Sequence, residues 1–395
     1  MKYNFVPMPQ RQALKWPFGK RMALILTTNL EYWLPSKETD NIIYPGGPGI
    51  VGGNLPGRIY DNPNWTWREY GHRVGVWRMF DLFKEASIPT SCTINALMAQ
   101  ERRSVVEYAV DQGYEIVAHN YEQSELLTDF QDDEEAERSV IKKTLNIYRD
   151  VVGKDAKGWL SSSLRSTPNT IDLIAEEGLT FFCDLLNDDQ PYLVETRSGK
   201  NIVSIPYTSE VNDFTVFLRQ GKDVDGAFNV FKEQFDWLYK ESAESGRHMN
   251  IGLHPHVIGQ PFRIRSLQRF LDYIKKFDDI WFPTREELAN WYLEHHKSHI
   301  ASSFFASSFR QSAILSIDGF GDFSSTMTAL GDENSFKVLK EVNYPHSLGI
   351  FYTVATQFLG FTNYGDEYKV MGLSCLLYTS PSPRDRTRSR MPSSA

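Results

Sequence analysis

Short apolar runs alternate with amphipathic stretches along most of this chain, and this alternation restricts its fold more than any other feature. A strand followed repeatedly by a stretch with helical spacing predicts parallel strands covered by helices. Strands are expected at residues 22–28, 90–94, 114–118, 179–183, 202–205 and 249–253, and helices at 70–85, 101–112, 132–151, 170–177, 227–241 and 264–276. We therefore expect an α/β fold, in the form of a barrel, up to about residue 294.

Composition narrows the classes of partner. The net charge of −8 gives no reason to expect a nucleic-acid partner. No run approaches the roughly 18 apolar residues of a membrane span, and residues 1–16 lack the apolar region of a signal peptide. The three cysteines are too few and too scattered for a disulfide framework. We expect a cytoplasmic protein with a small-molecule partner.

Two histidines mark the end of the last expected strand. His254 and His256 follow the run that ends at Leu253, just before a turn rich in glycine and proline. Catalytic groups collect at the carboxyl ends of parallel strands, and histidine both gives and takes a proton near neutral pH. The alternative is a turn with two surface histidines.

Polar residues also follow other expected strands. Glu31 comes directly after the first strand and is a candidate metal ligand or general base, or else a solvated carboxylate. His119 follows the strand at 114–118 and is a candidate ligand or substrate-orienting group. Trp159 and Asp189 belong to segments that are candidates for a polar pocket wall, although ordinary turn chemistry also explains the acidic run near Asp189.

Together these clusters resemble the polysaccharide deacetylase superfamily, also called the NodB-homology domain, and within it the allantoinase-like branch. The resemblance covers residues 4–293 and rests on residues 14–21, 67–78, 188–192 and 254–256. It implies a distorted (β/α) barrel in residues 1–294 that hydrolyses a non-peptide C–N bond in carbohydrate or ureide metabolism. The implied substrate is a small amide or an N-acetylated sugar.

The chain departs from the metal-dependent relatives at two places. Where they carry an Asp pair after the first strand, this chain has Asn29 and Glu31, and where they carry His-x-x-x-His, it has His119 and Gln123. Glutamine is not among the usual ligands of zinc. We expect either no metal or a weakly held divalent metal on Glu31 and His119.

The expected catalytic roles follow from what remains. We assign Glu31 as the general base and His254 as the acid that protonates the leaving nitrogen. Substrate binding is assigned to five residues: His119, Trp159, Asp189, His256 and Arg263. The alternative is a non-catalytic barrel that binds a carbohydrate or ureide.

The segment from 295 to 374 has a different texture. His295 and His299 are spaced to share one face of a helix, and Asp318, Gly319 and Gly321 form a glycine loop after a strand. With the motifs at 345–349 and 364–373, they resemble the N-terminal domain of the NodU-like carbamoyltransferases. The resemblance implies an incomplete ASKHA-like α/β fragment whose histidines bind a metal and whose loop binds nucleotide. ATP and metal are expected only if that domain were complete, as in a bifunctional deacetylase and carbamoyltransferase.

The junction and the tail suggest a chimeric sequence. The barrel ending and the transferase motif abut at 294/295 without a linker. Residues 375–395 are rich in Ser, Pro and Arg, and they can be encoded by a sequence resembling a transposon-based sequencing adapter. We expect this tail to be disordered and artefactual. The aromatic segment at 3–16 is a candidate surface for a homo-oligomer.

Overall fold

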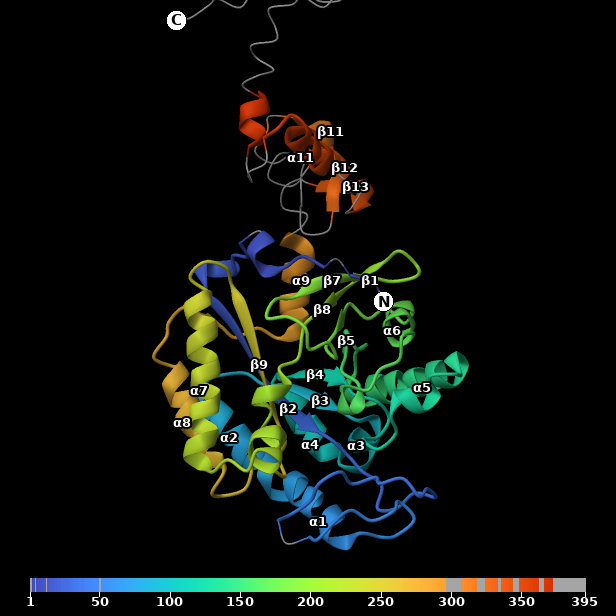
Figure 1. The fold of residues 1–395 in the computed structure, drawn as a ribbon. Helices are drawn as coiled ribbons and strands as arrows, with labels where there is room; N and C mark the ends of the chain where they lie inside the picture. The colour runs from blue at the N-terminus through green and yellow to red at the C-terminus, as the bar shows by residue number, and fades with distance from the viewer. Residues whose placement is uncertain are drawn as a thin grey trace, which may run out of the picture. The chain divides into compact units, whose positions relative to one another are not determined.

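The computed structural model describes residues 2–3, 5–11, 13–49, 51–295, 307, 309–317, 324–332, 335–343, 348–361 and 366–371. The chain divides into two compact units, Met1–His295 and His296–Ala395. In the first unit, helices surround a curled sheet (Figure 1).

The sheet of the first unit is mainly parallel. In spatial order its strands are β1 (Lys2–Tyr3), β7 (Tyr192–Glu195), β8 (Asn201–Ser204), β6 (Phe181–Phe182), β5 (Gly158–Trp159), β4 (Glu115–Ala118), β3 (Ser91–Ile94), β2 (Met22–Leu30) and β10 (Ile280–Trp281), with β9 (Arg247–Leu253) also paired to β2. Among the strands that the structure describes, β1 and β7 alone join it antiparallel. No pairing among the described residues joins β9 to β1, so the barrel is open, which confirms the expected distorted barrel.

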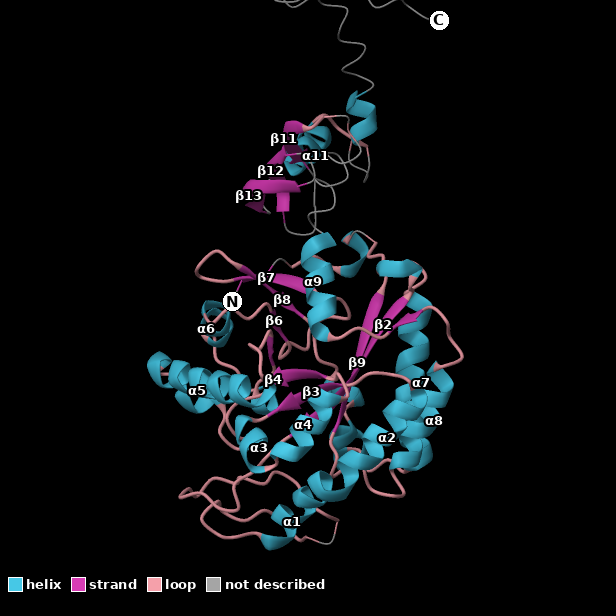
Figure 2. Ribbon diagram, turned by 180° about the vertical axis from the view of Figure 1, so that it is seen from behind, coloured by secondary structure: helices cyan, strands magenta, loops and turns pink. Residues whose placement is uncertain are grey.

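Helices cover the outside of this sheet (Figure 2). They are α1 (Asn62–Tyr70), α2 (Val76–Ala86), α3 (Ala96–Glu101), α4 (Arg103–Asp111), α5 (Glu134–Val152), α6 (Thr170–Glu176), α7 (Val224–Glu241), α8 (Ile264–Ile274) and α9 (Arg285–His295). Side chains start two of the longest: Asp133 accepts from the Ala136 amide at α5, and Asp223 accepts from the Gly226 amide at α7. None of the described helices is both long and apolar enough to span a bilayer.

The helix expected over residues 70–85 consists of several helical segments in the structure. The sequence predicts a helix over 70–85, and the structure has α1, a π-helical turn at Gly71–Gly75 and then α2. A Cβ on Gly71 would lie 2.6 Å from the His256 amide nitrogen, and one on Gly75 would lie 2.0 Å from the Pro255 carbonyl oxygen. The two glycines therefore let this turn of helix press directly against the loop after β9.

The second unit is described in part. Its strands β11 (Gln311–Ile317), β12 (Ser324–Asp332) and β13 (Ser335–Asn343) form an antiparallel sheet, and α11 (Leu348–Phe358) follows. The strand that was expected before the glycine loop is present as β11. Its described hydrophobic cluster has three buried members, Ile314, Met327 and Ala329. His299, Asp318, Gly319, Gly321 and the tail 375–395 lie outside the described residues.

Candidate active site

Strand register brings the candidate residues together. Leu30 pairs with Ile94, Ile94 with Ala118, and Ala118 with Trp159. On the other edge of β2, Thr28 pairs with Leu253. Because these strands are parallel, the residues that follow them, namely Glu31, Asn95, His119, Leu160 and His254, emerge at one end of the barrel. We call this the open end.

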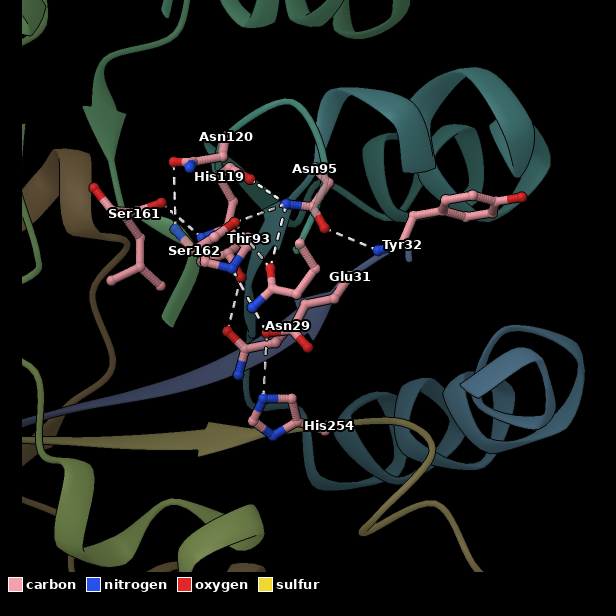
Figure 3. A network of polar contacts seen from close by, with 12 residues as sticks. Asn29, Glu31, Tyr32, Thr93, Asn95, His119, Asn120, Ser161, Ser162 and His254 are labelled. Atoms are coloured by element: carbon pink, nitrogen blue, oxygen red, sulfur yellow. Dashed lines mark hydrogen bonds and ion pairs between the residues drawn. The ribbon is translucent and has the colours of Figure 1, made fainter. Parts of the chain in front are cut away.

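A buried carboxylate lies between two imidazoles at the open end (Figure 3). The Glu31 Oε1 atom is 3.4 Å from His254 Nε2 and 3.6 Å from His119 Nε2. Glu31, His119 and His254 are each less than 8% exposed. At such low exposure, charged groups persist only when they are paired, so the three side chains form one electrostatic unit.

A second carboxylate, which was not singled out from the sequence, completes this unit. Asp213 Oδ1 is 2.6 Å from His254 Nδ1, and its Oδ2 accepts from the backbone amides of His254 and Ile258 at 2.8 and 3.2 Å. Asp213 is fully buried. It comes 41 residues before His254, in a loop after β8, so spacing gave no sign of it. The Asn212-Asp213 pair in a loop that follows a strand was the only signal available.

The protonation states follow from this geometry. Burial alone would raise the pKa of Glu31, but the charge of His254 and then the close contacts with both imidazoles outweigh it and hold that pKa far below its ordinary value. Burial alone would lower the pKa of His254, but Glu31 and Asp213 outweigh it and raise the pKa to about 10. At neutral pH, the His254 ring is therefore an imidazolium cation with both nitrogens protonated, and Glu31 is an ionised carboxylate.

Each ring also has a fixed orientation. His119 Nδ1 lies 2.6 Å from the Leu160 carbonyl oxygen, which can only accept, so Nδ1 carries a proton and Nε2 faces Glu31. His72 Nε2 likewise contacts the Glu31 carbonyl oxygen at 2.8 Å, while its Nδ1 contacts Glu69. The backbone that carries Glu31 is thus anchored to the helical segment at 62–86.

An amide network lies beside the Glu31 carboxylate (Figure 3). Asn95 accepts from the Tyr32 amide at 2.8 Å and donates to the His119 carbonyl oxygen. Ser162 Oγ donates to the side-chain oxygen Oε1 of Gln123 at 3.0 Å, and Asn95 Nδ2 approaches the same oxygen at 3.4 Å. These bonds join the loops after β2, β3, β4 and β5, so they fix the positions of four strand ends relative to one another.

A pocket of about 200 Å³ opens over this unit. Its lining includes Glu31, His119 and His254 together with Asn29, Trp33, Gln123, Ser161, Ser163, Tyr207, Asn212, Phe214 and Arg219. Tyr207 and Arg219 were not singled out from the sequence. A Cβ at Gly252 would lie 1.7 Å from the Tyr207 hydroxyl oxygen, so glycine at this place in β9 leaves room for that hydroxyl.

Four residues assigned to substrate binding lie outside this lining. Trp159 is fully buried, and its Nε1 donates to Ser161 Oγ at 3.0 Å. His256 packs edge-on against Trp67 at 4.7 Å between ring centroids. Arg263 lines a neighbouring cavity. The backbone carbonyl oxygen of Asp189 accepts from the His248 amide near the start of β9, at the other end of this strand from His254.

His256 sits in a cationic and aromatic setting. Burial and then the charge of Arg68 hold its pKa well below the ordinary value, so it is neutral. Arg68 is buried too, with its guanidinium 4.4 Å from the Trp33 ring and 4.9 Å from the Tyr44 ring. The two histidines of the turn therefore differ: His254 faces the pocket charged, and His256 faces the core neutral.

The donor set does not fit a catalytic metal. Such zinc sites use three protein ligands, and no group of three or more His, Cys, Asp or Glu suited to a metal occurs among the described residues. At the Gln123 position the amide oxygen already accepts from Ser162, and His254 Nδ1 is engaged by Asp213.

Comparison with known proteins identifies the first unit. A protein of Schizosaccharomyces pombe named as a polysaccharide deacetylase is 30% identical over 251 residues, which span 58% of this chain and 75% of that one. The chain belongs to the polysaccharide deacetylase family. It follows that this is a hydrolase of the class that acts on carbon–nitrogen bonds other than peptide bonds.

Solved structures agree with this assignment. The crystal structure of the allantoinase PuuE matches with a TM-score of 0.65 and 32% identity over 72% of this chain and 95% of that one. A polysaccharide deacetylase-like structure from Pseudomonas aeruginosa PAO1 matches with a TM-score of 0.65 and 30% identity over 72% of this chain and 96% of that one. The likeness to the allantoinase-like branch is thereby confirmed.

A family model described as the carbamoyltransferase N-terminus matches residues 209–382. The nodulation protein NolNO of Sinorhizobium fredii is 44% identical over 92 residues, which are 23% of this chain and 13% of that one. The resemblance stated for the second unit is confirmed. The match to this family model begins at residue 209, inside the first unit, whereas the carbamoyltransferase-like motifs in the sequence begin at residue 295.

Proposed function

We propose that the first unit hydrolyses a small amide or ureide by acid–base catalysis at Glu31 and His254. The observation that carries this proposal is the arrangement at the floor of the pocket. An ionised carboxylate lies 3.4 Å from a protonated imidazole, and both line the same cavity. A base and an acid held side by side in opposite protonation states are what amide hydrolysis requires.

The proposed steps use these groups in turn. Glu31 accepts a proton from a water molecule as the water oxygen attacks the amide carbon. His254 then donates its proton to the nitrogen as the C–N bond breaks, giving a carboxylic acid and an amine. Asp213 acts as a positioning residue: it holds the His254 ring by Nδ1 and stabilises the imidazolium, so that Nε2 faces the substrate.

The oxyanion needs donors that are not already used. Tyr207 and Ser161 line the pocket, and their hydroxyl oxygens accept from Asn212 Nδ2 at 2.9 Å and from Trp159 Nε1 at 3.0 Å. The Tyr207 hydroxyl therefore keeps its own proton for donation, whereas the Ser161 side chain also hydrogen-bonds the buried Asp184 carboxylate. We assign the Tyr207 hydroxyl to the developing negative charge. Trp159 thus supports the site through Ser161.

The proposal is tested by assaying the full chain on allantoin and on N-acetylated oligosaccharides, with and without EDTA. We expect turnover of a small amide that EDTA changes by less than about twofold, and that Glu31→Gln and His254→Gln both abolish. Turnover that EDTA abolishes would instead assign Glu31 and His119 to a metal. Ligand binding with no turnover on either panel would favour the non-catalytic barrel.

A further inference from the structure

A second cavity adjoins the catalytic pocket and contains two arginines. It is lined by Pro45, Gly46, Gly47, Gly49, Phe214, Phe217, Leu218, Arg219 and Arg263. Pro45, Phe214 and Arg219 also line the catalytic pocket. The two cavities therefore meet along one shared wall, so a ligand whose amide lies over Glu31 has a second compartment within reach. We call this second compartment the arginine cavity.

The charge of Asp213 acts on Arg263, but neither arginine of the cavity is held in a direct ion pair by a described carboxylate. Among the described residues no ion pair of Arg219 or Arg263 is found, whereas Arg11, Arg102, Arg138 and Arg197 each pair with an acidic side chain. The Arg263 Nε atom is buried and has no hydrogen-bond partner in the part of the chain that the structure describes. A guanidinium with unused donors inside a cavity has both the charge and the geometry to bind an oxyanion.

Aromatic rings fix where the two guanidiniums lie. The Arg263 guanidinium lies 5.1 Å from the Phe217 ring and 5.0 Å from the Phe262 ring, and that of Arg219 lies 5.8 Å from the Phe214 ring. Stacking holds the planar group while leaving its N–H edge free. Burial lowers the pKa of Arg263, yet arginine remains charged at neutral pH.

The loop that contains Gly46 lines the arginine cavity and approaches the Phe214 ring closely without filling the cavity. A Cβ on Gly46 would lie 2.9 Å from the Phe214 ring, and the backbone there has a φ of +74°. Glycine adopts this conformation freely. Substitution at Gly46 would move either the loop or the ring that the two cavities share, so the shape of the arginine cavity depends on this glycine.

We propose that the arginine cavity binds an anionic substituent of the substrate, with Arg219 and Arg263 as its specificity-determining residues. The substrate class is then an amide or ureide that carries a carboxylate. This inference rests on the proposed function only in placing the amide over Glu31; binding of the anion itself does not require turnover.

The test uses two probes that differ by one charge, N-acetylglycinate and the neutral N-acetylglycinamide. Their binding to the full chain carrying Glu31→Gln is measured by calorimetry at low and high salt, and their hydrolysis is measured on the unmodified chain. We expect the anion to bind at least about tenfold more tightly, an advantage that salt weakens because it screens the charges. Arg219→Gln and Arg263→Gln should each reduce that ratio about tenfold.

Arg73 offers a matched control, because it is exposed and lines neither cavity. Arg73→Gln should leave the anionic preference in place. Equal affinity for the two probes, or no binding of either at millimolar concentration, would overturn the inference. Preferential binding of the anion without hydrolysis of either probe would uphold the inference while the proposed hydrolysis fails, so the two claims are distinguishable.

Discussion

The barrel buries a carboxylate at each of its ends, Glu31 at one and Glu115 at the other, and the two carboxylates have different kinds of partner. At the open end, Glu31 contacts two imidazoles and lines a pocket. At the start of β4, Glu115 accepts from the backbone amides of Arg285 and Glu286, each at 2.8 Å, and from Ser91. Glu115 therefore caps the first turn of α9, and its oxygens are saturated by fixed donors.

The difference shows in the pKa of each carboxyl. Burial raises the pKa of Glu115 even though Arg285 and its hydrogen bonds oppose the shift. Burial acts on Glu31 too, but the charges of its histidine partners reverse the outcome. A buried carboxylate surrounded by backbone donors indicates a structural role. One that shares its charge with titratable groups beside a pocket indicates catalysis.

The largest expected effect comes from the matched substitutions Glu31→Gln and Glu115→Gln. Glu31→Gln should lower kcat by about 10²–10⁴-fold because it removes the base, and it should also lower stability at neutral pH because the buried charge of His254 loses one of its two carboxylate partners. Glu115→Gln should keep kcat close to that of the parent. The NH₂ group of the new glutamine would face a backbone N–H, and two donors cannot hydrogen-bond each other. The unfolding free energy should therefore fall by about 1–3 kcal/mol. Steady-state kinetics and thermal unfolding of both variants measure these effects. A Glu115→Gln protein that folds but is inactive would contradict the distinction between a catalytic Glu31 and a structural Glu115.

Asp213→Asn tests the positioning of His254. The His254 pKa of about 10 depends in part on the Asp213 charge. His254 must be protonated to act as an acid, so activity should fall as pH rises through this value. In the variant the alkaline limb should move to lower pH, and kcat should fall about 10–100-fold. A pH–rate profile reports both; an unmoved alkaline limb would assign that limb to another group.

Gly252→Ala tests the packing of the pocket wall. The added Cβ would collide with the Tyr207 hydroxyl, displacing a proposed oxyanion donor. We expect kcat to fall by roughly tenfold or more, since small misplacements carry large rate costs. Gly52→Ala is the control because a Cβ there meets no atom within 4 Å. Equal kcat for the two variants would remove Tyr207 from the mechanism.

The smallest expected effect is the opposite pH dependence of stability at the two ends. The lowered pKa of Glu31 means that its contribution is present above the ordinary value of 4.5 and is lost as pH falls. The raised pKa of Glu115 means that its contribution is fully present below 4.5 and declines as pH rises. Relative to each Gln variant, the parent's Tm advantage should therefore grow with pH for Glu31 and shrink for Glu115. Two slopes of the same sign would contradict the account.

The sequence predicted the fold well where local pattern decides it. The strands that carry Glu31, His119 and His254 were placed within a few residues, because each is a short apolar run ending in a polar group. The strand β7, Tyr192–Glu195, was not predicted. It pairs antiparallel with both β1 and β8, so it depends on its partners more than on its own apolar pattern.

The site was only partly readable from the sequence because much of it depends on contacts between distant residues. Glu31 and His254 could be singled out because both stand at strand ends. The His254-Pro255-His256 turn gave no means of telling its two histidines apart. Only the folded chain shows that Asp213 holds one ring while Trp67 packs on the other. Arg263 was found by its type, but its place in a separate cavity required the fold.

A double-mutant cycle on kcat tests the central claim most directly, that Glu31 and His254 act as one unit. The parent, Glu31→Gln, His254→Gln and the double variant would be assayed on one amide in the presence of EDTA. The account predicts that each single substitution loses nearly all of the rate and that the double variant is scarcely slower than either. Rate losses that multiply in the double variant, or a single variant that keeps the parent rate, would contradict it.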